Sequence, residues 1–272
     1  MKDYNKIKID EIISNGSVLE KKEIAKQGYG LDKLIDDKHW EVRFAVAEQG
    51  YALDELKNDE NAYVRKVVAK QGYGLDKLVN DEHWVVRREV AKQGYGLDRL
   101  INDEDYLVRR EIVKLGYDVH KFANDEHWLV RKEVAKQDCN LEDLINDKHW
   151  EVRFAVAEQG YGLDKLINDE HLAVRKVVAK QGYGLDKLVN DESPEIRELA
   201  KELKNAKVYT IERNFGTYNG NIYLYVWKNK YEIVSGCYET TSLENWKKKC
   251  TEQLDKKTAN IYYNKMKETI GA

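Results

Sequence analysis

Apolar and polar residues follow a pattern that returns every 22 residues along most of the chain, and a Val-Arg pair marks each return. A fixed period of this length is the signature of a stacked repeat architecture. Residues 37–82 and 147–192 are nearly identical, which indicates an internal duplication of five repeats. The pair occurs at Val42-Arg43, Val64-Arg65, Val86-Arg87, Val108-Arg109, Val130-Arg131, Val152-Arg153 and Val174-Arg175, and Ile196-Arg197 closes the series.

Each repeat carries two apolar groups, as the third copy illustrates. The group between Val86 and Ala91 has the spacing of one helical face. Gly94 stands where that helix should end in a left-handed cap. The pattern therefore predicts a helix over about residues 84–93. The second group, residues 97–101, is too short for a full α-helix and predicts one turn of 3-10 or α-helix.

The position before each long helix carries polar side chains suited to an N-cap. In the last copy Ser193 precedes Pro194, which is the usual order of N-cap and first helical turn. Because one short amphipathic helix cannot bury its apolar face alone, we expect neighbouring repeats to stack into a solenoid. The N-cap position is occupied by His39, Asn61, His83, Asp105, His127, His149, His171 and Ser193.

The ends of the array should differ from its middle, because terminal repeats expose one face to water. Ser17 and Glu20 form a candidate capping box, and a longer closing helix follows Pro194 and ends near Asn205. We therefore predict a mostly α fold in which a superhelical solenoid of eight to nine repeats covers residues 1–206. An amphipathic opening helix is indicated by Tyr4, Ile7, Ile9, Ile12 and Ile13.

The pattern changes after residue 206. KVYTIERN, NIYLYVWKN and KYEIVSGCY are β-branched and aromatic runs between Gly and Asn turns, and they predict three strands. SLENWKKKCTEQLD and TANIYYNKMKETI then predict two helices, so we expect a small α+β domain over residues 207–272. It holds 11 Lys and Arg against 7 Asp and Glu, whereas residues 1–206 hold 35 against 42. We expect this domain to supply a second contact or a dimerisation unit.

The repeat sequence D-x-x-x-x-VR-x-x-VA, followed by L-x-x-L, resembles the leucine-rich repeat variant family, an α/3-10 superhelix distantly related to HEAT repeats. The resemblance covers residues 18–204 and implies the fold rather than a function. Family members usually have a proline-containing turn and a slightly longer repeat, whereas the turn here reads QGYG. The family's iron–sulfur member has a cysteine cluster, which this sequence lacks.

The stretch LYVWKNKYEIVSGCYETTSLENW resembles a small C-terminal domain of phage and bacterial repeat proteins, including some with pentapeptide repeats. The resemblance implies no established activity. Cys237 lies in this stretch, but residues 207–272 contain no His that could activate it as a nucleophile. We therefore expect Cys237 to be a small buried residue at a strand end.

An Asp recurs six residues before the Arg of each Val-Arg pair. We expect a ladder of partly buried ion pairs and cap contacts that involves the Asp of the same repeat or its neighbour. An Arg stripe that contacts a partner is the alternative. The central members of the ladder are Asp81, Arg87, Asp103, Arg109, Asp125 and Arg131.

Composition and motifs argue against several classes of protein. The net charge of −3 provides no overall basic surface for nucleic acid, and no run of 18 apolar residues predicts a membrane span. Scattered cysteines and the lack of a signal peptide predict free thiols in a bacterial cytoplasm, or a host cytoplasm if the chain is phage-encoded. Phosphate-loop and hydrolase motifs are absent from the sequence, and His residues about 8–10 Å apart in stacked repeats cannot share a zinc ion. We predict no enzyme activity, catalytic residue, cofactor or metal.

Four helical positions vary between copies: the tryptophan position and those one, four and five residues later. They share one helix face, and aromatic anchors within a charged rim are typical of interface hot spots. We predict a non-enzymatic protein-binding scaffold with an exposed face formed by Trp40, Phe44, Trp84, Arg88, Tyr106, Arg110, Trp128, Lys132, Trp150 and Phe154. A second ribbon comes from the turn residues Tyr29, Tyr51, Tyr73, Tyr95, Tyr117, Tyr161 and Tyr183.

Three alternatives remain open at this point. The tryptophans could pack between repeats and be structural. The chain could be a phage or prophage inhibitor of a host factor, acting through acidic columns of the Glu82 and Asp98 type that mimic nucleic acid. Helical repeats also bind nucleic acid in other proteins, but they do so with a basic face that this acidic array lacks.

Overall fold

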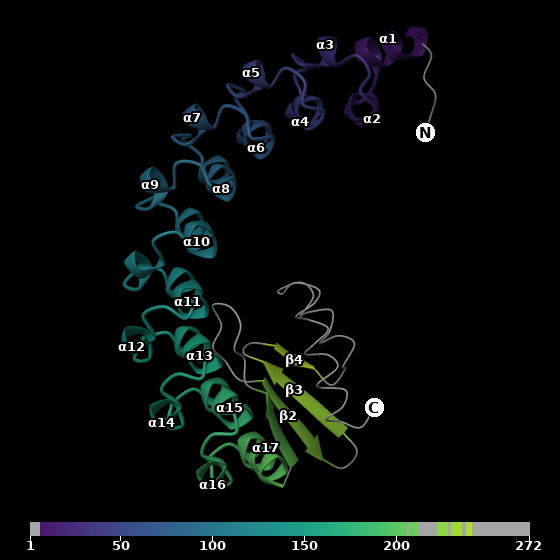
Figure 1. The fold of residues 1–272 in the computed structure, drawn as a ribbon. Helices are drawn as coiled ribbons and strands as arrows, with labels where there is room; N and C mark the ends of the chain where they lie inside the picture. The colour runs from purple at the N-terminus through teal and green to yellow at the C-terminus, as the bar shows by residue number, and fades with distance from the viewer. Residues whose placement is uncertain (1–5, 206, 212–221, 228–229, 236–237, 241–272) are drawn as a thin grey trace. The chain divides into compact units, whose positions relative to one another are not determined.

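A computed structural model describes residues 6–205, 207–211, 222–227, 230–235 and 238–240. Contacts divide the chain into two compact units, Met1–Asp118 and Val119–Ala272, and each is described by itself. In both units a repeat contributes one long helix and one short helical turn (Figure 1). The predicted helical array of 22-residue repeats is therefore confirmed, and the described part of the chain is mostly helical.

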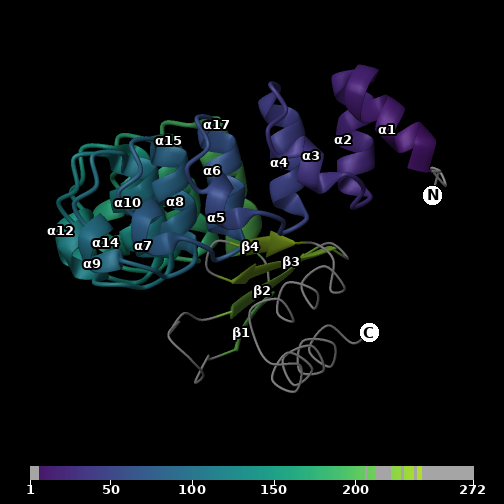
Figure 2. The ribbon, with the colours of Figure 1, turned by 90° about the horizontal axis from the view of Figure 1, so that it is seen from above.

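In the first unit the long helices form one layer and the short helices the other. The long helices pack in sequence order, and α6 and α8 lie side by side in both Figure 1 and Figure 2. The long helices of this layer are α2 (Val18–Lys26), α4 (Trp40–Glu48), α6 (Ala62–Lys70), α8 (Trp84–Lys92) and α10 (Tyr106–Lys114), whereas α1 (Lys6–Asn15) lies in the row of the short helices (Figure 1). The short helices are α3 (Leu31–Leu34), α5 (Leu53–Leu56), α7 (Leu75–Leu78) and α9 (Leu97–Leu100).

The second unit repeats this two-layer arrangement and ends in a longer helix. Its first short element, η1 (Val119–Phe122), is a 3-10 helix, whereas every other short element of the described chain is one α-helical turn. The long helices are α11 (Trp128–Lys136), α13 (Trp150–Glu158), α15 (Leu172–Lys180) and α17 (Pro194–Lys204). The short ones are α12 (Leu141–Leu144), α14 (Leu163–Leu166) and α16 (Leu185–Leu188).

Four strands follow the last helix: β1 (Lys207–Ile211), β2 (Ile222–Trp227), β3 (Lys230–Ser235) and β4 (Tyr238–Thr240). They form one antiparallel sheet in chain order, with Lys207 opposite Val226 and Ile222 opposite Ser235. The first three coincide with the three predicted runs, and β4 is an additional short strand. The two helices predicted after residue 240 and Cys237 lie outside the described residues, so the α+β domain over 207–272 stays a prediction.

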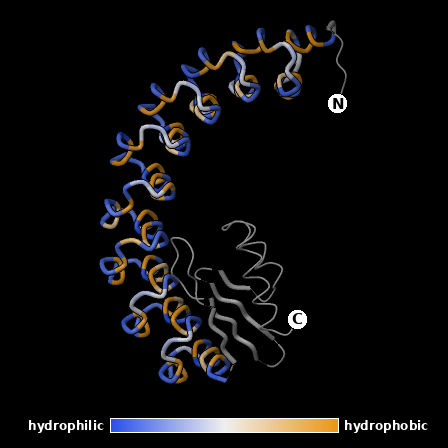
Figure 3. Tube along the Cα trace, viewed as in Figure 1, coloured by the Kyte–Doolittle hydropathy of each residue, from blue (hydrophilic) through white to orange (hydrophobic). Residues whose placement is uncertain are grey.

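The core of each repeat comes from the two apolar groups of the sequence. In the second repeat Val64 and Val68 of α6 are fully buried and Leu78 of α7 is nearly so. Figure 3 shows hydrophobic and hydrophilic residues alternating along the helices, as expected when one side of each helix is packed.

The turn between the two helices of a repeat needs left-handed backbone at two places. Gly94 ends α8 with φ 72°, and Gly96 precedes α9 with φ 61°. A Cβ on Gly96 would lie 2.7 Å from Val79 Cγ2 of the preceding repeat, so the position also restricts side-chain size. The predicted left-handed cap at Gly94 is confirmed.

The predicted helix starts are confirmed, with one difference in how they are capped. Ser17 and Glu20 form the expected capping box. The side chains of Asn61, Asp105 and most of the N-cap His residues accept from the backbone two residues on. Ser193 occupies the N-cap of α17, but its side chain makes no cap hydrogen bond.

The Arg of each Val-Arg pair connects one repeat to the next. Arg87 donates from Nε and Nη2 to the two carboxylate oxygens of Asp103, at 2.6 and 2.9 Å. Its Nη1 donates to the carbonyl oxygen of Asp81 at 2.8 Å. Both side chains are nearly buried, with 9% of Arg87 and 4% of Asp103 exposed. The ion pair thus joins Arg to the Asp of the following repeat, and only the backbone of the Asp in its own repeat is used.

The same geometry recurs along both units. Arg109 donates to the carbonyl oxygen of Asp103 at 2.7 Å, and Asp125 accepts from the backbone N–H of His127 at 2.8 Å. Further bidentate pairs are Arg43–Asp59, Arg65–Asp81, Arg131–Asp147, Arg153–Asp169 and Arg175–Asp191.

Removing one partner of this pair should be costly in the middle of the array. We expect Arg87→Ala to lower the free energy of unfolding by about 3 kcal/mol, because the Asp103 carboxylate stays buried without its cation. Arg197 is the matched control, since within the described residues its hydrogen bonds run only to the carbonyl oxygens of Asp191 and Glu192. Arg197→Ala should cost about 1 kcal/mol. Equal losses in urea titrations would contradict the role of the inter-repeat pair.

The ladder also predicts acid sensitivity. Burial raises the pKa of Asp147, but hydrogen bonds from Arg131 and the backbone N–H of His149, with the charge of Arg131, bring it below the ordinary value. A lowered pKa stabilises the fold above the unfolded pKa of about 3.9, and this contribution is lost as the pH falls through the folded pKa. The melting temperature should therefore be nearly constant from about pH 7 to pH 5 and fall below about pH 4. Asp147→Asn should melt lower at pH 7 and change less with acid, and an unchanged acid profile would contradict this assignment.

Candidate partner-binding face

The ten residues predicted to form the binding face all lie on long helices, and all ten are half-buried. The face that the sequence indicated as exposed is therefore only partly accessible. The position five residues after the tryptophan position packs between neighbouring helices, as buried Ala45, Val67 and Glu89 show. Val85, one residue after Trp84, is buried as well. We call the ten half-buried residues the aromatic face.

Stacking on the following repeat explains why the tryptophans are half-buried. The ring of Trp128 lies 4.0 Å from that of His149 at an interplanar angle of 5°. Trp150 lies 3.9 Å from His171 at 10°. Each imidazole also caps its own helix, because Nδ1 of His149 accepts from the backbone N–H of Glu151 at 3.3 Å. At these two positions one face of the tryptophan ring is covered by the next repeat, as the alternative of tryptophans packed between repeats implies.

Charged residues of the aromatic face are held by acids one repeat later. Lys132 Nζ lies 2.6 Å from Glu151 and 5.9 Å from the centre of the Trp128 ring. Arg88 Nε lies 3.1 Å from Glu111. Phe154 meets Trp150 edge-on at 6.2 Å. The face therefore combines aromatic rings with cations in fixed positions.

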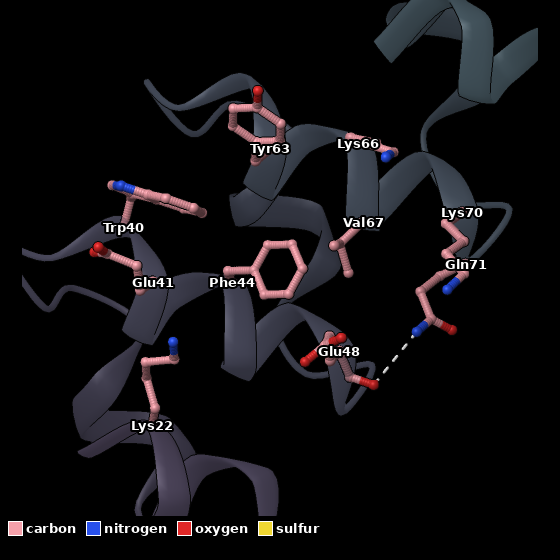
Figure 4. A pocket seen from close by; sticks show the side chains of 10 residues that line it. All are labelled: Lys22, Trp40, Glu41, Phe44, Glu48, Tyr63, Lys66, Val67, Lys70 and Gln71. Carbon is pink, nitrogen blue, oxygen red and sulfur yellow. Dashed lines mark hydrogen bonds between the residues drawn. The ribbon is translucent and has the colours of Figure 1, made fainter. Parts of the chain in front are cut away.

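A cavity of about 480 Å³ opens where α2, α4 and α6 meet (Figure 4). Phe44 and Val67 lie at the middle of its lining, and Trp40 and Tyr63 lie together on one side of them. The rings of Trp40 and Tyr63 are 5.6 Å apart and tilted by 30°, and Phe44 meets Trp40 edge-on at 6.1 Å. The charged and polar lining residues are Lys22, Glu41, Glu48, Lys66, Lys70 and Gln71.

The aromatic-face prediction contained only Trp40 and Phe44 of this cavity. Lys22 was missed because it occupies the equivalent of Phe44 in the degenerate first repeat. Glu48 and Lys70 stand eight residues after the tryptophan position, one helical turn beyond the position four residues after it. Residues four apart lie on the same side of a helix, so including this position would have found both.

The turn tyrosines form a separate surface. All seven are exposed, with between 36 and 41% of each residue accessible. Tyr73 hydrogen-bonds to Asp54 of the preceding repeat at 3.1 Å, and Lys57 lies 5.8 Å from its ring centre. We call this set the tyrosine ribbon.

Three observations on the described residues concern metal binding, thiol reactivity and membrane spans. They contain no group of three His, Cys, Asp or Glu residues that could hold a metal ion. Burial raises the pKa of the Cys139 thiol, and the charges of Glu142 and Asp138 raise it further, which disfavours a reactive thiolate. None of the helices within the described ranges has the length and apolar character needed to cross a membrane.

Comparison with known proteins does not assign the chain to a family. The sequence matches no model of a known protein family and has no significant match among curated proteins.

The two copies of the duplicated segment allow the His stack to be tested. His149→Ala should lower the free energy of unfolding by about 1.5 kcal/mol, because it removes an N-cap acceptor and an aromatic contact. His39 has the same neighbours in sequence but makes no side-chain cap hydrogen bond. His39→Ala should cost less than about 0.5 kcal/mol. A larger loss for His39→Ala in denaturant melts would contradict the stacking argument.

Proposed function

We propose that this chain is a non-enzymatic scaffold that binds a protein partner through the aromatic face of its long helices. The observation that carries the proposal is the cavity between α2, α4 and α6, which is lined by three aromatic rings and rimmed by charged residues. Buried aromatic anchors within a charged rim are typical of the centre of protein interfaces.

Rigidity supports the same proposal. Bidentate Arg–Asp pairs hold consecutive long helices of each unit in register. The aromatic and cationic side chains of the face are fixed by contacts such as Trp128–His149 and Lys132–Glu151. Side chains that are ordered before binding lose less conformational entropy when a partner docks, which favours affinity.

The proposal includes the finer assignments that the sequence indicated. We place the array with the leucine-rich repeat variant family and its α/3-10 superhelix, on the strength of the repeat sequence and the short helical turns. We assign residues 207–272 to a small α+β domain of the kind found on phage and bacterial repeat proteins, which would offer a second contact or a dimer interface. We place the protein in the cytoplasm.

A second candidate function is inhibition of a host factor by acidic mimicry of nucleic acid. The observation that favours it is a line of strongly exposed glutamates on the ladder side of the repeats. Their side chains are 79–86% exposed and occupy the same position of the repeat, three in the first unit and two in the second. The line comprises Glu60, Glu82, Glu104, Glu170 and Glu192.

An unbiased peptide library tests the scaffold proposal without knowledge of the partner. A random library displayed on phage is panned against the wild-type protein, and enriched peptides are measured on two variants of equal net charge. Trp40→Ala combined with Phe44→Ala changes the aromatic face at the cavity. Tyr95→Ala combined with Tyr183→Ala changes the tyrosine ribbon and serves as the control.

We expect enriched peptides to lose at least tenfold in affinity on the face variant and to keep their affinity on the ribbon variant, because the anchors lie on the face. Thermal melts of both variants verify folding. The reverse ranking would move the binding surface to the tyrosine ribbon, and an absence of enriched peptides would contradict the scaffold proposal.

A further inference from the structure

The second copy of the duplicated segment carries the equivalents of most residues that line the cavity, and we call this equivalent surface the second version. Trp40, Phe44 and Lys66 correspond to Trp150, Phe154 and Lys176. The main differences in the wall are Asn61 and Tyr63, where the second version has His171 and Ala173. One repeat later, Val85 replaces Glu195. These differences decide which groups are open to a ligand.

The aromatic wall is covered in the second version and uncovered in the first. His171 stacks on Trp150 at 3.9 Å. At the equivalent place Asn61 is an N-cap whose side chain accepts from the backbone of Tyr63 at 2.9 Å. Trp40 therefore has no imidazole over its ring, and Tyr63 extends the aromatic wall instead.

The cations are paired in the second version and unpaired in the first. Lys176 forms an ion pair with Glu195, and Lys132 forms one with Glu151. Lys66 faces no such acid, because the residue equivalent to Glu195 is the buried Val85. Within the described residues, neither Lys66 nor Lys22 makes an ion pair. Lys66 is thus a cation in the cavity lining that forms no ion pair within the described residues.

We propose that this cavity binds an acidic peptide segment, inserting an aromatic or branched aliphatic side chain against Phe44 and Val67, beside Trp40 and Tyr63, and placing an adjacent carboxylate on Lys66. A volume of about 480 Å³ exceeds one side chain and suits a short peptide stretch. The carboxylate supplies the counter-charge that Glu195 supplies to Lys176 in the second version. This inference rests on the scaffold function proposed above and names the chemistry of its partner.

The acids on the rim limit the ligand to a few negative charges. Glu41 and Glu48 line the same cavity. They would repel a polyanion such as single-stranded nucleic acid, which carries a phosphate at every nucleotide. A peptide with one or two carboxylates beside an apolar side chain avoids this repulsion, so the peptide is favoured over an oligonucleotide.

Fluorescence anisotropy of the labelled peptide Gly-Ser-Glu-Phe-Glu-Ser-Gly, which carries two side-chain carboxylates, tests the proposal on the full chain. We expect binding that weakens with salt and at least fivefold weaker binding by Lys66→Ala. Lys176→Ala, the same change in the second version, should bind as the wild type does. The double variant Asn61→His with Tyr63→Ala converts the first cavity to the sequence of the second and should weaken binding at least tenfold. Both residues occur at the equivalent positions 171 and 173, so this variant is expected to fold.

Two further peptides and one oligonucleotide complete the test. Replacing Phe by Ser, or every acid by Lys, should abolish binding of the peptide. Equal binding of the Lys peptide, equal effects of Lys66→Ala and Lys176→Ala, or tighter binding of oligo-dT would each overturn the inference. If library peptides lose affinity on the Trp40 and Phe44 face variant but are indifferent to Lys66→Ala, the scaffold function stands and this inference fails.

Discussion

The bidentate ion pair between the Arg of one repeat and the Asp of the next is the interaction on which the array depends. The pair fixes the distance and the rotation between successive long helices. The planar guanidinium donates two parallel hydrogen bonds to the two carboxylate oxygens, and this arrangement requires a defined mutual orientation of the two side chains. The Arg also donates to the backbone at the start of its own helix, so one side chain joins two repeats and a helix terminus. A repeat of altered length would misplace the carboxylate, which accounts for the constant spacing of 22 residues.

Much of the fold follows from the sequence because it depends on local rules. The position of each long helix, its N-cap and its left-handed C-terminal glycine are set by residues within a few positions of one another, as Ser17 with Glu20 and Gly94 show. The 3-10 or α character of the short turns could not be decided from pattern alone, since both place the same leucines inward. The structure assigns α-helix to all of them in the described chain except Val119–Phe122.

The candidate site was less predictable because it depends on which side chains of neighbouring repeats come into contact. The sequence pattern of a single repeat does not specify these contacts. Free exchange of Trp with Ala62 and Leu172 indicated an exposed position, yet Trp128 and Trp150 are half-covered. A His of the next repeat stacks on each of these two rings, so variation at one position did not mean absence of contact. The same reason left the partner of each Arg open, since an Asp six residues before it and an Asp sixteen residues after it are both within reach along the sequence.

The identity of the junctions between repeats has a genetic consequence. Because each repeat presents an Arg at one side and an Asp at the other in a constant geometry, a block cut at any two equivalent points has ends that fit any other repeat. Unequal recombination between such sequences can therefore lengthen the gene by whole repeats, and every junction between repeats keeps its Arg–Asp pair. The near-identity of residues 37–82 and 147–192 is the expected trace of such an event. Each added block brings a further copy of the surface, which later substitutions can then adapt to a different ligand while the original copy keeps its role.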